Sequence, residues 1–199
     1  MNTKRTYTMR VRADGVEETR RRILQATFDL HSERLISEIV LDDVAERAGV
    51  SVQTVLRQFG SRGGLLEATA TYANGVVVEE RRAPVGDVVA AVRTIVEHYE
   101  LRGHTALMML AQEGSDPSIR GVTEMGRQTH RAWVEECFAP YLVQRRGAAR
   151  EALIDLLVVS TDVYTWKLLR RDRGLSRATT EQRMTQLLNS LLGETAPEA

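Results

Sequence analysis

Hydrophobic residues recur at helical spacing along most of the chain, and this limits the possible fold more than any other sequence feature. After Pro84, for example, apolar residues stand at Val88, Val92, Ile95 and Tyr99, a spacing that places them on one face of an α-helix. No segment sustains the apolar–polar alternation of a half-buried strand, and turn residues fall between the periodic segments. The sequence therefore predicts an all-α fold of about nine helices.

Capping residues and breaks set the expected limits of these helices. The first helix should begin after Asp14 and end near Leu35, and the helix capped by Ser61 should run to the interruption at Arg81 and Pro84. The remaining helices are expected at residues 42–47 and 51–59, from residue 88, at residues 107–110 between Gly103 and Gly114, from residue 117 to Pro140, at residues 148–173, and after Ser176.

The charge and the cysteine content narrow the class of protein. The formal net charge is zero, so affinity for nucleic acid would have to come from a local patch. Cys137 is the single cysteine, which excludes an intramolecular disulfide and a cysteine-based zinc cluster. The first residues lack the apolar core of a signal peptide, and no apolar run approaches the ~20 residues that span a membrane. We expect a cytoplasmic protein with no membrane partner.

Residues 41–59 have the spacing of a helix-turn-helix unit. Gly49 can adopt the left-handed conformation that the turn needs, and Ala45 is small enough for the two helices to approach closely. Ser51 is placed to cap the second helix, while Val55 and Phe59, at i and i+4, can hold it against the core.

The second helix of this unit leaves polar side chains facing outward. Arginine can pair bidentately with guanine, glutamine with adenine, and threonine can touch a thymine methyl group or a phosphate. The alternative is an ordinary helical hairpin with a solvated polar face. We predict that the helix enters the major groove of double-stranded DNA, with contacts from Ser51, Val52, Gln53, Thr54, Arg57 and Gln58.

The same region resembles the N-terminal DNA-binding domain of the TetR family of transcriptional regulators. The resemblance covers about the first third of the chain and is carried by Ala26, Leu30, residues 44–51, Thr54, Phe59, Ser61, Arg62, Leu65 and Leu66. It implies a three-helix DNA-binding domain, a larger helical ligand-binding domain and a homodimer whose last two helices form a four-helix bundle with those of the partner. Arg62 stands where the family usually has a lysine that faces a phosphate. Leu56 replaces a common tyrosine of the family.

We therefore expect three parts in the chain. Residues 1–14 should form a disordered basic arm, residues 15–62 the helix-turn-helix domain, and residues 63–199 the helical ligand-binding and dimerisation domain.

Aromatic, methionine and polar residues of the second domain are candidates for a ligand pocket. The alternative for each of them is that it packs in the hydrophobic core and contacts no ligand. The predicted pocket residues are Tyr72, Tyr99, Met108, Met109, Gln112, His130, Trp133 and Phe138. Apolar positions of the last helices form the predicted dimer interface, although they could instead pack within one subunit: Leu153, Leu156, Leu157, Tyr164, Leu168, Leu187, Leu188 and Leu191.

The sequence offers no catalytic, metal or cofactor site. It has no nucleophile elbow, residues 60–64 do not form a phosphate-binding loop of the P-loop type, and the four histidines are scattered. We expect a DNA-binding repressor, not an enzyme, that a small hydrophobic effector releases from a near-palindromic operator. The alternatives are a helical protein-interaction module and a small-molecule-binding or catalytic protein with a vestigial DNA-binding domain. The salt dependence of binding separates the DNA-binding hypothesis from these alternatives, because binding to DNA phosphates should weaken steeply as the salt concentration rises.

Overall fold

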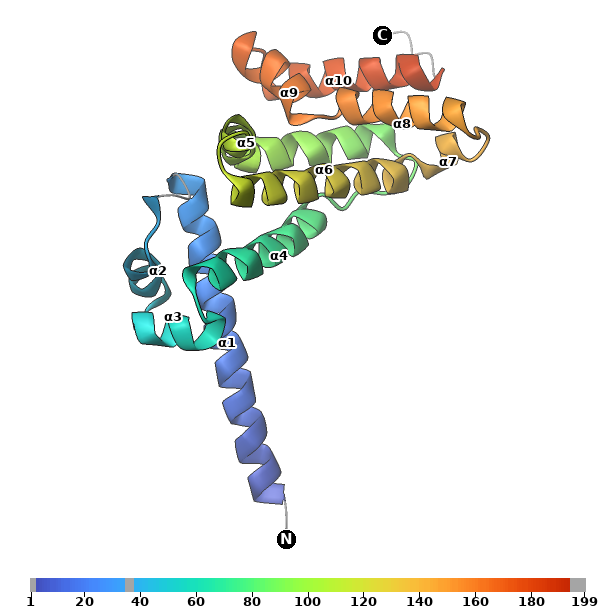
Figure 1. Cartoon of the computed structure of the whole chain (residues 1–199). Coiled ribbons are helices and arrows are strands. Elements are labelled where there is room, and N and C mark those ends of the chain that lie inside the picture. The colour runs from blue at the N-terminus through green and yellow to red at the C-terminus, as the bar shows by residue number, and fades with distance from the viewer. Residues whose placement is uncertain (1–2, 35–37, 194–199) are drawn as a thin grey trace. The chain divides into compact units, whose positions relative to one another are not determined.

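The computed structural model describes residues 3–34 and 38–193, and within these ranges the regular elements are all helical (Figure 1). This confirms the predicted all-α class, with ten α-helices and one short π-helix in the described ranges. The chain divides into two compact units, Met1–Ala73 and Asn74–Ala199. The division lies later than the expected boundary after residue 62, because the first half of the fourth helix packs with the first unit.

Unit 1 contains α1 (Thr3–Glu33), α2 (Leu41–Ala48), α3 (Val52–Phe59) and the first part of α4 (Arg62–Glu80). The short helix α2 packs against α1 and α3 (Figure 1). Side chains from all four helices form a small apolar core, whose most buried members are Ile23, Leu30, Val44, Val55 and Leu65.

The first helix is longer than the sequence predicts. It begins at Thr3, so the disordered arm expected over residues 1–14 is wrong from residue 3 onward. Residues 3–14 contain no proline, and the glycine that follows them costs a helix only about 1 kcal/mol relative to alanine. Nothing in this stretch therefore stops the helix from continuing backward. The predicted end near Leu35 lies outside the described residues.

Unit 2 is built mainly from four longer helices that pack on one another. They are α5 (Val88–Gln112), α6 (Pro117–Cys137), α8 (Ala148–Ser160) and α10 (Arg177–Leu192). Helix α5 packs against α6 and α10, and α8 packs against the same two helices. Three short elements connect them: α7 (Ala139–Leu142), α9 (Val163–Trp166) and the π-helix η2 (Lys167–Asp172).

Two expected helix limits in unit 2 are wrong. Gly103 does not separate two helices but lies inside α5, where a Cβ atom would come 2.6 Å from the Trp166 ring. The glycine is therefore needed for helix packing. The single helix expected at residues 148–173 breaks at Thr161 and Asp162, because the Asp162 carboxylate accepts a hydrogen bond from the Tyr164 N–H (2.8 Å) and starts α9.

Candidate DNA-binding surface and buried polar cluster

The turn between α2 and α3 has the backbone conformation that its glycine predicts. Gly49 adopts φ 65° and ψ 41°, in the left-handed region, where a side chain would be strained. The N–H of Val50 donates to the carbonyl of Ala45 (2.9 Å), and the N–H of Gly49 donates to Glu46 (3.1 Å). These bonds close the end of α2 and fix the direction in which α3 leaves the turn.

Helix α3 is held at both ends. At its start, the Ser51 hydroxyl accepts from the Thr54 N–H (3.2 Å), as the predicted cap requires. At its end, Arg20 of α1 donates from Nη1 to the carbonyl of Gln58 (3.2 Å) and lies 4.5 Å from the centre of the Phe59 ring. The sequence analysis did not single out Arg20, because this contact joins positions that are distant along the chain.

The structure sorts the predicted DNA-contacting residues by exposure. Ser51, Gln53 and Arg57 are exposed, whereas Thr54 and Gln58 are half-buried. Val52 is also half-buried and packs against the core of unit 1. Helix α3 contains no acidic residue, so the charge of Arg57 is not opposed from within the helix. The exposed polar face predicted for this helix is present and carries positive charge.

Arg62, at the start of α4, makes a contact within unit 1. Its Nε donates to the carbonyl of Ile39 (3.2 Å), in the segment just before α2. Burial first, and the positive charge of Arg62 second, lower the pKa of His31 to about 4. Arg62 therefore fastens the entry to the helix-turn-helix unit, whether or not it also reaches a phosphate.

The residues that form this helix-turn-helix unit match a known protein family. Residues 23–69, which include α2, α3 and the adjoining parts of α1 and α4, match the family described as "Bacterial regulatory proteins, tetR family". This part of the chain is similar to the DNA-binding domain of the TetR family. The resemblance inferred from residues 26–66 is thereby confirmed.

Similarity to a curated transcriptional regulator extends beyond the first domain. The chain is 29% identical over 141 residues to the HTH-type transcriptional regulator AlkX of Mycobacterium tuberculosis. This match covers 70% of the chain but 64% of that relative's length.

Solved structures share the TetR fold over most of the chain. A TetR-family transcriptional regulator from Streptomyces coelicolor aligns with a TM-score of 0.68 at 20% identity, covering 88% of this chain and 80% of its own. Salmonella enterica GusR aligns with a TM-score of 0.66 at 16% identity, covering 88% of this chain and 96% of its own. At these identities the likeness establishes the fold alone.

The predicted pocket residues fall into separate groups. Tyr99, His130, Trp133 and Phe138 are buried together in unit 2, where Trp133 stacks on His130 and meets Phe138 edge-on. Tyr72 belongs to unit 1, where its hydroxyl donates to Gln25 (2.6 Å). Its inclusion in the pocket stays a prediction. The others, half-buried on the last turns of α5, are Met108, Met109 and Gln112.

Arg81 is the residue that sequence reasoning missed. It was interpreted only as a break after α4, yet its side chain is 9% exposed and lies inside unit 2. Its Nη2 donates to Nε2 of His98 (3.0 Å), and its backbone carbonyl accepts from the Trp133 indole (2.6 Å). In turn, Nδ1 of His98 donates to Glu80 (3.0 Å). No sequence motif marks this cluster, because its members come from three separate helical segments.

The ionisation of the buried histidines follows from this cluster. Burial first, and the charge of Arg81 second, lower the pKa of His98 to about 2 and that of His130 to about 4. Both rings are therefore neutral near pH 7. This agrees with the hydrogen bonds of His98, whose Nε2 accepts from Arg81 while its Nδ1 donates.

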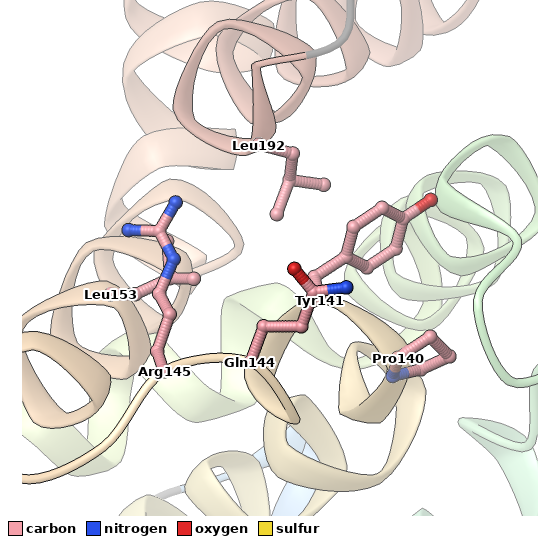
Figure 2. Close-up of a pocket in the computed structure, with 6 residues that line it drawn as sticks. All are labelled: Pro140, Tyr141, Gln144, Arg145, Leu153 and Leu192. Carbon is pink, nitrogen blue, oxygen red and sulfur yellow. The ribbon is translucent and has the colours of Figure 1, made fainter.

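A hollow lies at another place in unit 2, away from the buried polar cluster. It has a volume of about 200 Å³ and opens between α7, the loop after it, α8 and α10 (Figure 2). Its lining residues are Pro140, Tyr141, Gln144, Arg145, Leu153 and Leu192. Leu153 lines this hollow and belongs to the core of unit 2.

The predicted dimer residues also divide. Leu157 and Leu188 are fully buried in the core of unit 2, as Leu153 nearly is, so these residues pack within one subunit and the interface prediction is wrong for them. Leu191 is half-buried against the same core. The members that remain exposed on α8, α9, η2 and α10 are Leu156, Tyr164, Leu168 and Leu187, and exposed Val159 joins them.

The described part of the chain holds neither a candidate metal site nor a candidate membrane span. Within it, no group of histidine, cysteine or acidic side chains is arranged to hold a metal ion. None of its helices is both long enough and apolar enough to cross a membrane.

Proposed function

We propose that this chain is a transcriptional regulator that binds double-stranded DNA as a homodimer in the cytoplasm, and that it acts as a repressor. The observation that carries the proposal is the exposed polar face of α3, with Gln53 and Arg57, on a helix fixed at both ends by Ser51 and Arg20. A rigid helix of this kind can present side chains to base edges in the major groove. The match of residues 23–69 to bacterial regulatory proteins supports the same interpretation.

A second copy of the chain would supply the second recognition helix. One such helix reads few bases, whereas a dimer reads two half-sites about 34–36 Å apart, or a multiple of this spacing, on a near-palindromic operator. The exposed apolar side chains of Leu156, Val159 and Leu187 on α8 and α10 support a subunit contact there, since clustered exposed apolar residues mark interaction surfaces.

Release from the operator would follow from binding a small, largely hydrophobic effector inside unit 2. The aromatic side chains of Tyr99, Trp133 and Phe138, buried close to polar groups, suit such a ligand. An effector of this kind changes DNA affinity only by its difference in affinity between the conformation that fits the operator and the one that does not.

The test is selection of bound duplexes from random DNA by the purified full chain, followed by affinity measurements at several salt concentrations. Arg57→Ala should weaken binding to the selected site by about 1–3 kcal/mol and relax the preference for one base pair. The matched control is Arg93→Ala, which removes an exposed arginine on α5 and should leave binding unchanged.

Arg62→Ala should instead weaken binding about equally for all sequences. The affinity of the wild-type chain should fall steeply with salt, with a logarithmic slope near −0.9 for each phosphate contact. Absence of any preferred duplex at low salt would exclude a sequence-specific regulator, and a protein-interaction module would then become the leading hypothesis.

A further inference from the structure

The guanidinium of Arg81 lies in the interior of unit 2 without a carboxylate in contact with it. Its partners are the ring nitrogen of His98 (3.0 Å) and the face of the Tyr99 ring (5.7 Å). Its Nε–H is buried and has no hydrogen-bond acceptor among the described residues. A buried cation normally has a paired anion, because leaving water is otherwise strongly unfavourable.

The two nearby acids are engaged elsewhere. Glu80 accepts from Arg102 (2.7 Å) and from His98 (3.0 Å). Asp162 accepts from the backbone N–H of Tyr164 (2.8 Å) and starts α9. Arg81 is therefore close to negative charge, but it keeps one N–H directed at no acceptor.

A second buried atom without a partner belongs to His130, which is 5% exposed. Its Nε2 lies 3.3 Å from the carbonyl of Val158 and 3.2 Å from the Thr161 hydroxyl. Since the carbonyl can only accept, Nε2 carries the proton and Nδ1 is an acceptor. Among the described residues, nothing donates to this Nδ1.

Trp133 contacts both of the residues that carry the unpartnered atoms. Its indole N–H donates to the backbone carbonyl of Arg81 (2.6 Å), and its ring stacks on His130 with centroids 5.7 Å apart. Burial first, and the charge of Arg81 second, lower the pKa of His130. One buried donor and one buried acceptor thus border the same aromatic region of unit 2.

We propose that this region binds a small organic acid with an apolar body, whose carboxylate accepts from Arg81 and whose hydroxyl or amide N–H donates to His130. The aromatic rings of Tyr99, Trp133 and Phe138 would surround the apolar body. The inference rests on the proposed function in that the acid would be the effector. It refines that function by requiring a negative charge, which a purely hydrophobic effector lacks.

The acid can bind only if the conformation of unit 2 changes. Both unpartnered atoms are closed to solvent in the structure, so the acid reaches them only when the surrounding helices separate. Binding therefore favours an opened conformation over the closed one described above, and the size of the effect equals the difference in affinity between the two.

The test compares acids with their uncharged amides at pH 7 by calorimetry and by the shift in Tm of the full chain. The probes are benzoate, phenylacetate and octanoate, each paired with benzamide, phenylacetamide or octanamide. At least one acid should bind and should exceed its amide by about 10- to 150-fold in affinity, the range expected for a hydrogen bond to a charged group.

Arg81→Met should remove this preference, because it keeps the apolar stem and deletes the charge. Arg82→Met is the matched control, since the neighbouring arginine is exposed and pairs with exposed Glu79; this variant should bind the acid as the wild type does. If Arg81→Met does not fold by circular dichroism, two other measurements decide. His130→Phe keeps an aromatic ring stacked on Trp133 but should weaken binding of the acid. In NMR spectra of the wild type, the Arg81 Nε–H resonance should shift as the acid is added.

The proposal fails if none of the acids binds, if acid and amide bind equally, or if folded Arg81→Met keeps the preference. It fails equally if the Arg81 resonance does not move. None of these measurements involves DNA. Operator binding without acid binding would support the proposed regulator and overturn the acid site. Acid binding without operator binding would support the acid site and overturn the proposed regulator.

Discussion

The two units of the chain use polar residues in opposite ways. Unit 1 keeps its candidate DNA-contacting groups at the surface of one short helix, and its cap joins residues three positions apart. Unit 2 buries polar groups in its interior, where Arg81 meets His98 across 17 positions and His130 meets Thr161 across 31. A surface site of the first kind leaves a local pattern in the sequence, whereas an interior site of the second kind leaves none.

The largest expected effect separates the core of unit 2 from its exposed face. Leu157→Ala removes a fully buried side chain and should lower the free energy of unfolding by about 2–5 kcal/mol. Urea unfolding followed by circular dichroism measures this loss. If the loss of stability instead depended on protein concentration, as for a residue in a dimer interface, the assignment of Leu157 to the subunit core would be contradicted.

The neighbouring residue provides the control. Leu156 is 49% exposed, so Leu156→Ala should change the stability of the single subunit by less than about 0.5 kcal/mol. It should instead raise the concentration at which the dimer dissociates in analytical ultracentrifugation. Equal behaviour of the two variants would remove the distinction between core and interface.

Gly103→Ala should have the next largest effect and should act only on unit 2. The added methyl group would meet the Trp166 ring at 2.6 Å, and overpacking of this kind costs about 1–3 kcal/mol. Thermal unfolding measures the change. Gly126→Ala on α6, where no atom lies within 4 Å of the added group, should not destabilise the chain.

Two identical caps allow a direct comparison of the units. Ser51 in unit 1 and Ser176 in unit 2 each accept from the N–H three residues later, at 3.2 and 3.1 Å. Either serine replaced by alanine should cost about 1 kcal/mol of stability. Ser51→Ala alone should also weaken DNA binding in an anisotropy titration. Comparable weakening by Ser176→Ala would show that stability, not the position of α3, controls affinity.

Acid should destabilise unit 2 more than unit 1, and this is the smallest effect near neutrality. His98 and His130 have pKa values lowered to about 2 and about 4, mainly by burial, whereas unit 1 has His31 alone, at about 4. Below pH 6.5 the unfolded chain takes up protons that the folded chain does not, so stability is present above that pH and is lost as pH falls.

A variant isolates the contribution of one histidine. His130→Phe should reduce the loss of unfolding free energy between pH 7 and pH 6 by less than about 1 kcal/mol, measured by urea unfolding at each pH. His104→Asn, at an exposed position on α5, is the control. If both variants behave alike, buried histidines are not the source of the acid sensitivity.

The sequence was sufficient for the fold class, the helix-turn-helix unit and the exposed face of α3. Gly49, Ser51 and Val55 could be interpreted because each acts on neighbours within one or two turns of helix, where spacing alone determines geometry. The same reasoning failed for Gly103. A glycine inside a helix and a glycine between helices look alike in sequence, and the difference here depends on Trp166, which approaches from a distant part of the chain.

The interior of unit 2 was predicted only in part. Aromatic and histidine residues could be named as candidates, but helical periodicity cannot separate an inward face from a face covered by a second subunit, which is why Leu157 was placed in the interface. Arg81 was missed for a related reason. Charged residues are almost never buried without a partner, so a basic pair after a helix is ordinarily interpreted as solvated.

Both tryptophans of the chain, Trp133 and Trp166, lie in unit 2. The first stacks on His130, and the second lies 5.8 Å from the Tyr99 ring. Tryptophan fluorescence therefore reports on unit 2 and is blind to unit 1. A change in tryptophan emission recorded while DNA is added would be a signal from outside the helix-turn-helix unit.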